Sequence, residues 1–206
     1  MVSGELLMDE VNITKASIKH RIEMGMRMVT EDPLRDNVVP GFSVLQNMAL
    51  VGIPPERRRG DIDWEAMQKQ FESFDSIKTL GVPASNRITR DLSGGNVQRV
   101  AFARAVISNP KLLIASYPSR GLDVATVNVV YNTLLRLKAG GTAVLLISED
   151  LNELYAISDR IVVLAANTSF GPFDPKELDM KELGKIMLKG QEMENEDKNS
   201  SSEAAV

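Results

Sequence analysis

The second half of the chain alternates short apolar runs with segments of helical periodicity, and this alternation constrains the fold more than any other feature. Apolar runs occupy Leu112–Ala115, Ala143–Ile147 and Ile161–Leu164. Helical patterns separate them at Ala125–Ala139 and from Asp150 onward. Because buried strands joined through helices form parallel sheets, this half predicts an α/β fold with a parallel, doubly wound sheet.

The first half contains shorter elements and more loop. The residues before 31 predict three elements: a strand from Gly4 to Met8, a helix around Ser17–Met24 and a strand at Met26–Val29. Residues 31–41 have a loop composition, and Ser43 with Gln46 forms a capping box that opens a short helix. A further helix is expected to begin after Asp63 and to end before Gly81. Its apolar side chains on one face would be Trp64, Met67, Phe71 and Phe74.

The composition is that of an ordinary globular protein and excludes several kinds of function. The 206 residues carry a net charge of −4, so no broad basic surface points to nucleic acid as a partner. The absence of cysteine excludes disulfides, thiolate metal sites and cysteine nucleophiles. No apolar run approaches the roughly 20 residues that span a bilayer, and the first ten residues lack a signal-peptide pattern. Residues 190–206 are polar, acidic and rich in serine, which predicts disorder.

A serine and two glycines at the start of an expected helix carry the clearest chemistry. The segment consists of Leu92, Ser93, Gly94, Gly95, Asn96, Val97 and Gln98. Glycine lets backbone N–H groups approach an anion closely, and the N-terminal end of the following helix attracts negative charge. Taken alone, the same residues also fit a plain glycine-rich helix cap.

The residues around these glycines favour the anion-binding interpretation. After the glycines come Arg99 to Val106, Asn109-Pro110-Lys111, the first apolar run and Pro118-Ser119-Arg120-Gly121-Leu122-Asp123. This succession resembles the signature motif, Walker B strand and D-loop of ABC ATPases. Together with Thr30-Glu31-Asp32 and Asp159–Leu164, the resemblance covers about residues 1–185. The Leu-Ser-Gly-Gly-Asn variant is similar to the carbohydrate-uptake branch, especially to the second of its two fused nucleotide-binding domains.

The resemblance implies a P-loop NTPase-like parallel sheet core with an inserted α-helical subdomain, truncated at its N-terminus. The implied divisions are residues 1–35 as a remnant of the ATP-binding core up to the Q-loop, 36–92 as the helical signature subdomain, 93–188 as the α/β core, and 189–206 as a disordered tail.

The chain departs from the family pattern at most of the positions that act on ATP. It contains no G-x-x-x-x-G-K-[ST] loop, so the phosphates would lack their backbone cradle and lysine. The Walker B strand runs into Ser116 and Tyr117, where the family has aspartate and glutamate. Glu149 stands where the switch histidine is expected, and Glu31 stands in place of the Q-loop glutamine. The one histidine, His20, lies in an early helix and is expected at the surface.

These departures, with the signature intact, imply a domain that serves a partner's ATP site. Leu92, Ser93, Gly94, Gly95, Asn96 and Gln98 would bind nucleotide in trans, while the degenerate positions Ser116, Tyr117 and Glu149 leave no catalytic residue intact in cis and no metal site. Asp123 would contribute a D-loop contact, although it also fits a helix cap. The permease contact would involve Phe42, Val44 and Leu45, which also suit internal packing.

The resemblance further implies partners, cofactors and location. The partners would be the first nucleotide-binding domain, membrane permease subunits and, indirectly, a solute-binding protein. ATP and Mg²⁺ would act in the intact transporter, and no cofactor is expected for the chain alone. The expected location is the cytoplasmic face of the membrane. Three alternatives remain open: an active ABC ATPase whose Walker A lies in a missing segment or separate chain, a non-transport ABC protein, and an unrelated α/β interaction domain.

Overall fold

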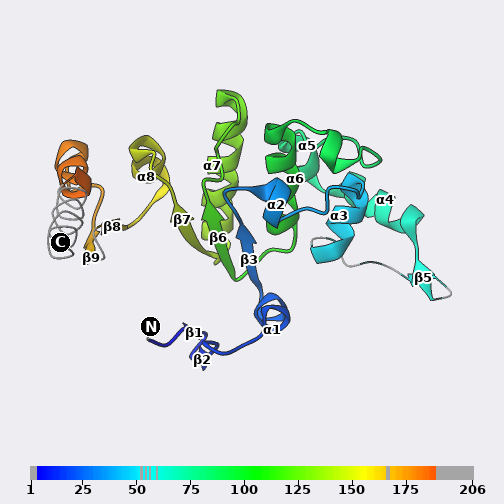
Figure 1. Cartoon of the computed structure of the whole chain (residues 1–206), viewed down its shortest axis with the longest axis horizontal. Helices are drawn as coiled ribbons and strands as arrows, with labels where there is room; N and C mark the ends of the chain where they lie inside the picture. Colours follow the sequence, from blue (N-terminus) through cyan, green and yellow to red (C-terminus); the bar gives the residue numbers. More distant parts are fainter. Residues whose placement is uncertain are drawn as a thin grey trace, which may run out of the picture. The chain divides into compact units, whose positions relative to one another are not determined.

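The computed structural model describes residues 4–188, except residues 52, 54, 56, 59, 166 and 167, and divides into two compact units (Figure 1). The first unit is Met1–Ile147 and the second is Ser148–Val206. The tail at residues 190–206, which the composition predicts to be disordered, lies outside the described residues.

A three-stranded parallel sheet forms the centre of the first unit. Its strands are β3 (Met26–Val29), β6 (Leu112–Ser116) and β7 (Ala143–Ile147), in the order β3-β6-β7. The middle strand β6 pairs with both neighbours, so that Ile114 lies opposite Met28 on one side and opposite Leu145 on the other. The predicted α/β class with a parallel sheet is therefore confirmed, and the strand at Met26–Val29 has the predicted bounds.

One face of this sheet forms the core, and two long helices pack against its strands. Val29, Leu113 and Ala115 have no exposed surface. Helix α6 (Gly94–Ile107) packs on β3, and helix α7 (Val124–Ala139) packs on β7. Because each helix begins at the end of the sheet where β6 finishes, both helix N-termini lie next to the residues that follow β6.

The segment before β3 forms a small hairpin and a short helix. Strands β1 (Leu7–Met8) and β2 (Val11–Asn12) pair antiparallel, and Asp9 and Glu10 between them adopt positive φ values of 48° and 65°. Helix α1 (Ile18–Glu23) begins at Ser17, whose hydroxyl accepts a hydrogen bond from the His20 N–H. The strand predicted from Gly4 pairs only over its last two residues.

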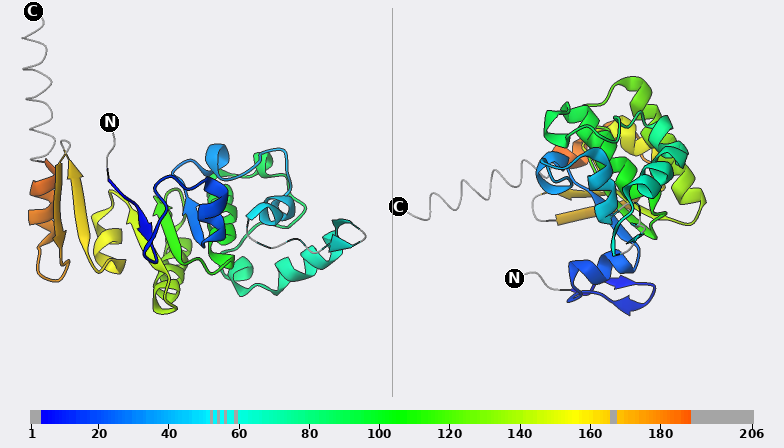
Figure 2. Two further views of the ribbon diagram at one scale, coloured as in Figure 1. Left: turned by 90° about the horizontal axis from the view of Figure 1, so that it is seen from below. Right: turned by 90° about the vertical axis from the view of Figure 1, so that its right-hand side faces the viewer.

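Between the adjacent strands β3 and β6 the chain passes through a series of short elements. These are α2 (Pro33–Asp36), α3 (Val44–Val51), β4 (Arg57–Arg58), β5 (Asp61–Ile62), α4 (Trp64–Ser73), α5 (Asp75–Thr79) and the 3₁₀ turn η1 (Thr89–Asp91). The predicted capping box at α3 is confirmed, because the Gln46 side chain accepts from the Ser43 N–H at 2.8 Å and Ser43 Oγ accepts from the Gln46 N–H at 3.2 Å. Strands β4 and β5 pair only with each other, as a hairpin that Figure 2 shows away from the sheet.

Two predictions for this segment are wrong in detail. The single helix expected after Asp63 is interrupted at Phe74, whose extended backbone (φ −75°, ψ 118°) separates α4 from α5. Met67 and Phe71 are buried on the expected face, but Trp64 remains 41% exposed. The expected loop at residues 31–41 contains the one-turn helix α2, because Asp32 caps it and Pro33 occupies its first position.

The second unit combines a helix, a hairpin and a further helical segment. Helix α8 (Leu151–Ile157) is capped by Asp150, and residues 180–188 are helical. Strand β8 (Ile161–Ala165) pairs antiparallel with β9 (Thr168–Phe173) rather than joining a parallel sheet. This corrects the prediction for Ile161–Leu164: two residues connect β8 to β9, and so short a connection permits only an antiparallel pair.

Candidate functional site

The serine and glycines of the signature segment form the first turn of α6. Ser93 caps the helix in an extended conformation, and its Oγ accepts from the Asn96 N–H at 3.4 Å. The first helical hydrogen bond runs from the Val97 N–H to the Ser93 carbonyl at 3.0 Å. The N–H groups of Gly94 and Gly95 precede that bond, so the helix itself supplies them with no acceptor. Ser93 and Gly94 are exposed, which leaves these donors accessible to an external anion.

The two glycines of the segment have different structural constraints. A Cβ atom on Gly94 would meet no other atom within 4 Å. A Cβ atom on Gly95 would lie 2.9 Å from the carbonyl oxygen of Gly121. Gly95 is therefore required for close packing between α6 and the turn that precedes α7, whereas Gly94 faces open space.

Gln98 attaches the signature helix to the residues that follow β6. Its side chain is 3% exposed. The amide Nε2 donates to the carbonyl oxygens of Tyr117 at 3.2 Å and Pro118 at 3.1 Å. These two bonds hold the first turns of α6 against the end of β6.

Arg99 connects the signature segment to the start of α7. Its Nη1 donates to Asn96 Oδ1 at 3.3 Å, and its Nη2 donates to Asp123 Oδ2 at 2.6 Å and to Thr126 Oγ1 at 2.7 Å. Asp123 in turn caps α7 by accepting from the Thr126 N–H at 3.0 Å. The hydrogen bonds from the Thr126 backbone and hydroxyl, followed by the charge of Arg99, hold the pKa of Asp123 below its usual value. The alternative role of Asp123 as a helix cap is thus present in the structure.

A different group of side chains occupies the end of β6. Tyr117 has a positive φ of 48°, and its N–H donates to the Ile147 carbonyl at 2.8 Å. The Arg120 guanidinium lies 5.7 Å from the centre of the Tyr117 ring and forms an ion pair with Glu31. Ser116 ends the strand. The carboxylate of Glu31 is therefore engaged by a cation of the same chain.

This end of β6 does not suit a magnesium ion. Serine and tyrosine offer neutral oxygens at pH 7, whereas Mg²⁺ in nucleotide sites is held through carboxylates. Glu31, which lies beside them, is already paired with Arg120. Within residues 4–188, apart from the six gaps, no group of three or more His, Asp or Glu side chains could hold a metal ion.

The remaining predicted residues lie elsewhere. Glu149 belongs to the second unit, where it precedes the α8 cap Asp150. His20 is exposed in α1, as predicted, with Nδ1 4.0 Å from a Glu23 carboxylate oxygen. Phe42 is 39% exposed, whereas Val44 at 0% and Leu45 at 9% are buried within the chain. Of these three proposed contact residues, Phe42 alone is well placed to meet a partner in this conformation.

Arg99 and Arg120 organise the site, although they were not among the residues expected there. Arg99 lies one helical turn after Asn96, a spacing that indicates an interaction on one helix face. Its bond to Asp123 and the pairing of Arg120 with Glu31 join segments 24 and 89 residues apart. Pairings at such separations leave no local pattern in the sequence.

Among the described residues, no helix combines the length and apolar character that a membrane span requires.

Sequence comparison finds several import proteins similar to this chain. Ribose import ATP-binding proteins of Clostridium tetani and Clostridium perfringens are 29% and 31% identical over 187 residues, which is 90% of this chain and 37% of each relative. A glucose import ATP-binding protein of Haloferax volcanii is 31% identical, over 91% of this chain and 35% of its own length. The chain thus spans little more than a third of these relatives.

Structure comparison finds the same fold in two dimeric structures of one bacterial ABC transporter cassette. The TM-score is 0.67 for its post-hydrolysis state bound to ADP and Pi and 0.66 for the other structure. Each is 24% identical, and the alignment covers 83% of this chain and 74% of the cassette. The sequence profile of the ABC transporter family matches residues 1–119, which is more than half of the chain. The chain therefore belongs to the ABC transporter family.

Proposed function

We propose that this chain is part of the ATP-binding subunit of an importer for simple sugars or nucleosides, and that it serves an ATP site formed with a partner domain. The observation that carries the proposal is an asymmetry within one unit. In the signature turn, Ser93 and Gly94 are exposed, and Arg99 attaches the turn to the D-loop residue Asp123, while the end of β6 carries Ser116 and Tyr117. Relatives named for ribose and glucose import support the importer class.

The signature turn has the donors that a terminal phosphate requires. The N–H groups of Gly94 and Gly95 and the hydroxyl of Ser93 lie together at the N-terminus of a 14-residue helix. Hydrogen bonds from such donors to a charged phosphate contribute roughly 1.5–3 kcal/mol each. Because a Cβ atom on Gly94 would have no neighbour within 4 Å, a phosphate group has room to approach there.

The chain's own ATP site is proposed to be inert. Magnesium does not fit at Ser116 and Tyr117, and the carboxylate of Glu31 is paired with Arg120. No hydrolytic step is therefore assigned to these side chains. ATP and Mg²⁺ would instead be held by the Walker motifs of the partner nucleotide-binding domain.

The proposed partners follow from the same arrangement. They are the first nucleotide-binding domain, which receives the signature, and a membrane permease, which would contact the exposed Phe42. A solute-binding protein would act through the permease, and the net charge of −4 gives no reason to invoke nucleic acid. The chain would work at the cytoplasmic face of the membrane.

The test is a pair of glycine substitutions in the intact transporter, read by ATP turnover and solute uptake. Gly94→Asp places a carboxylate where phosphate is proposed to bind, so both activities should fall to background. Gly184→Asp is the matched control, because Gly184 also faces open space without a positive φ, in the second unit. If Gly94→Asp retains both activities near the unmodified level, the role in trans is wrong.

A third variant separates the proposal from an active site in this chain. Tyr117→Phe removes the hydroxyl at the end of β6 but keeps the ring that lies near Arg120. Under the proposal, turnover and uptake stay unchanged. A loss of turnover in Tyr117→Phe would favour the alternative, an active ATPase domain completed by another segment.

A further inference from the structure

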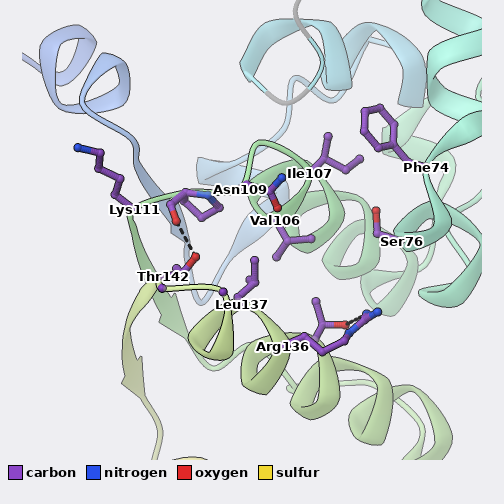
Figure 3. A pocket seen from close by; sticks show the side chains of 13 residues that line it. Phe74, Ser76, Val106, Ile107, Asn109, Lys111, Arg136, Leu137 and Thr142 are labelled. Atoms are coloured by element: carbon purple, nitrogen blue, oxygen red, sulfur yellow. Dashed lines mark hydrogen bonds between the residues drawn. The ribbon is translucent and has the colours of Figure 1, made fainter.

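A cavity of about 680 Å³ lies at the other ends of the two helices that begin at the signature and the D-loop (Figure 3). The last turns of α6 contribute Val106 and Ile107, and the last turns of α7 contribute Thr133, Arg136 and Leu137. A helix of 14 residues is about 20 Å long, so this cavity is distinct from the signature turn. Its volume falls within the range of small-molecule sites, roughly 300–1,000 Å³.

Local backbone features shape the cavity. The break between α4 and α5 puts Phe74 on the wall, where a continuous helix would carry it along the face of Phe71. Helix α7 ends at Ala139, Gly140 caps it, and Gly141 follows with a φ of 94°. The Thr142 hydroxyl then donates to the Pro110 carbonyl at 2.7 Å, which joins the segments that precede β6 and β7.

Two cations, Arg136 and Lys111, line the cavity together with apolar and neutral polar side chains. Arg136 donates from Nη2 to Thr133 Oγ1 at 3.3 Å and pairs with no carboxylate in the described part of the chain. The other lining cation, Lys111, is held by Asp9 at 2.6 Å, and Figure 3 shows it at the opposite side of the cavity from Arg136. None of the lining residues is acidic.

The helix C-termini at the cavity determine where an anion can sit. Exposed carbonyls there would repel a negative charge. However, the last carbonyls of α7 already accept hydrogen bonds from the residues that follow the helix. The Arg136 carbonyl accepts from the Gly140 N–H, the Leu137 carbonyl from the Thr142 N–H, and the Lys138 carbonyl from the Gly141 N–H. The favourable position for an anion is therefore at the guanidinium of Arg136, with the rest of the ligand directed toward the apolar wall.

We propose that this cavity binds a small organic carboxylate with a flat apolar body. The carboxylate pairs with Arg136, whose planar guanidinium offers donors in the geometry that a carboxylate accepts. The apolar body packs against Phe74 and the side chains of Val106, Ile107 and Leu137, which supply the buried contact area. This site is independent of the phosphate-binding role proposed for the signature turn.

The test compares two probes of nearly equal shape on the full chain by calorimetry. Naphthalene-2-carboxylate carries the charge, and the neutral naphthalene-2-carboxamide does not. The carboxylate should bind roughly tenfold more tightly, the difference expected when a single charge-assisted pair is gained. Amide chemical shifts should move at Ile107, Leu137 and Thr142 when it binds.

Two arginine variants assign the preference to the cavity. Arg136→Gln should bring the affinity for the carboxylate down to that for the carboxamide. Arg35→Gln is the control, because Arg35 is also an exposed helical arginine but lies in α2, outside the cavity. Three results would each overturn the proposal: no binding of the carboxylate at about 1 mM, equal affinities for the two probes, or a preference that survives in Arg136→Gln.

Discussion

Substituting alanine separately for the two signature glycines should have opposite effects on stability. Gly94 and Gly95 are adjacent in the first turn of α6. Alanine is favoured over glycine in a helix by up to about 1 kcal/mol, and this gain applies to both positions. The surroundings differ, since a Cβ on Gly94 meets nothing within 4 Å and one on Gly95 lies 2.9 Å from Gly121 O.

The magnitude of the effect follows from this contact. A backbone oxygen cannot rotate away as a flexible side chain would, so the turn at Gly121 must shift. Inserting a methyl group into packed structure costs about 1–3 kcal/mol. Because the helix-propensity gain is shared, the difference in unfolding free energy between Gly94→Ala and Gly95→Ala should be about 1–3 kcal/mol. Gly94→Ala is the more stable of the two.

The assay is urea-induced unfolding followed by the fluorescence of Trp64, the single tryptophan. Trp64 and α6 belong to the same compact unit, so the signal reports the unit that carries the substitutions. Equal unfolding free energies for the two variants, within about 0.5 kcal/mol, would refute the reasoning. That result would mean that the turn at Gly121 accommodates a methyl group without cost.

Three further predictions concern the same unit. Gln98→Leu removes the donor to the Pro118 carbonyl and one of the two donors to the Tyr117 carbonyl, which also accepts from the Arg120 N–H, and should lower the unfolding free energy by about 1–3 kcal/mol, measured by urea titration. Asp123 has a lowered pKa, so its ionised form stabilises the fold above about pH 4 and this contribution is lost as the pH falls through the folded-state pKa. The loss of unfolding free energy caused by Asp123→Asn should therefore be largest at neutral pH and should disappear in acid. If the unfolding free energies of the variant and the unmodified chain differ by the same amount at every pH, this prediction is wrong. The chain alone should release phosphate from ATP no faster than a background control, and turnover abolished by Tyr117→Ala would disprove this.

Local patterns in the sequence predicted most of the elements correctly. Apolar runs bounded by glycine and proline predicted β3, β6 and β7, and side-chain caps predicted the starts of several helices. Ser43, Asp63 and Ser93 each accept the hydrogen bond expected of a cap. Such contacts span three residues, so the sequence contains all the information they require.

Features that depend on distant segments were not predictable in this way. The break at Phe74 interrupts a continuous apolar face, and no glycine or proline marks it. For Val44 and Leu45 the sequence left both a permease contact and internal packing open, and in the fold both side chains are buried. The pairing of Glu31 with Arg120 joins the segment after β3 to the segment after β6, and the parallel arrangement of these strands brings the two side chains together.

The hydrogen bonds from Gln98 have a consequence for how this domain tolerates mutation. Both acceptors are main-chain carbonyls, those of Tyr117 and Pro118. A carbonyl is present whatever side chain a residue carries, so the attachment of α6 does not depend on the chemical identity of position 117. Under the proposed function, a change of side chain at position 117 would therefore alter the chain's own ATP site without loosening the signature helix. A single substitution at position 117 can thus change the chain's own ATP site while the signature turn keeps its attachment.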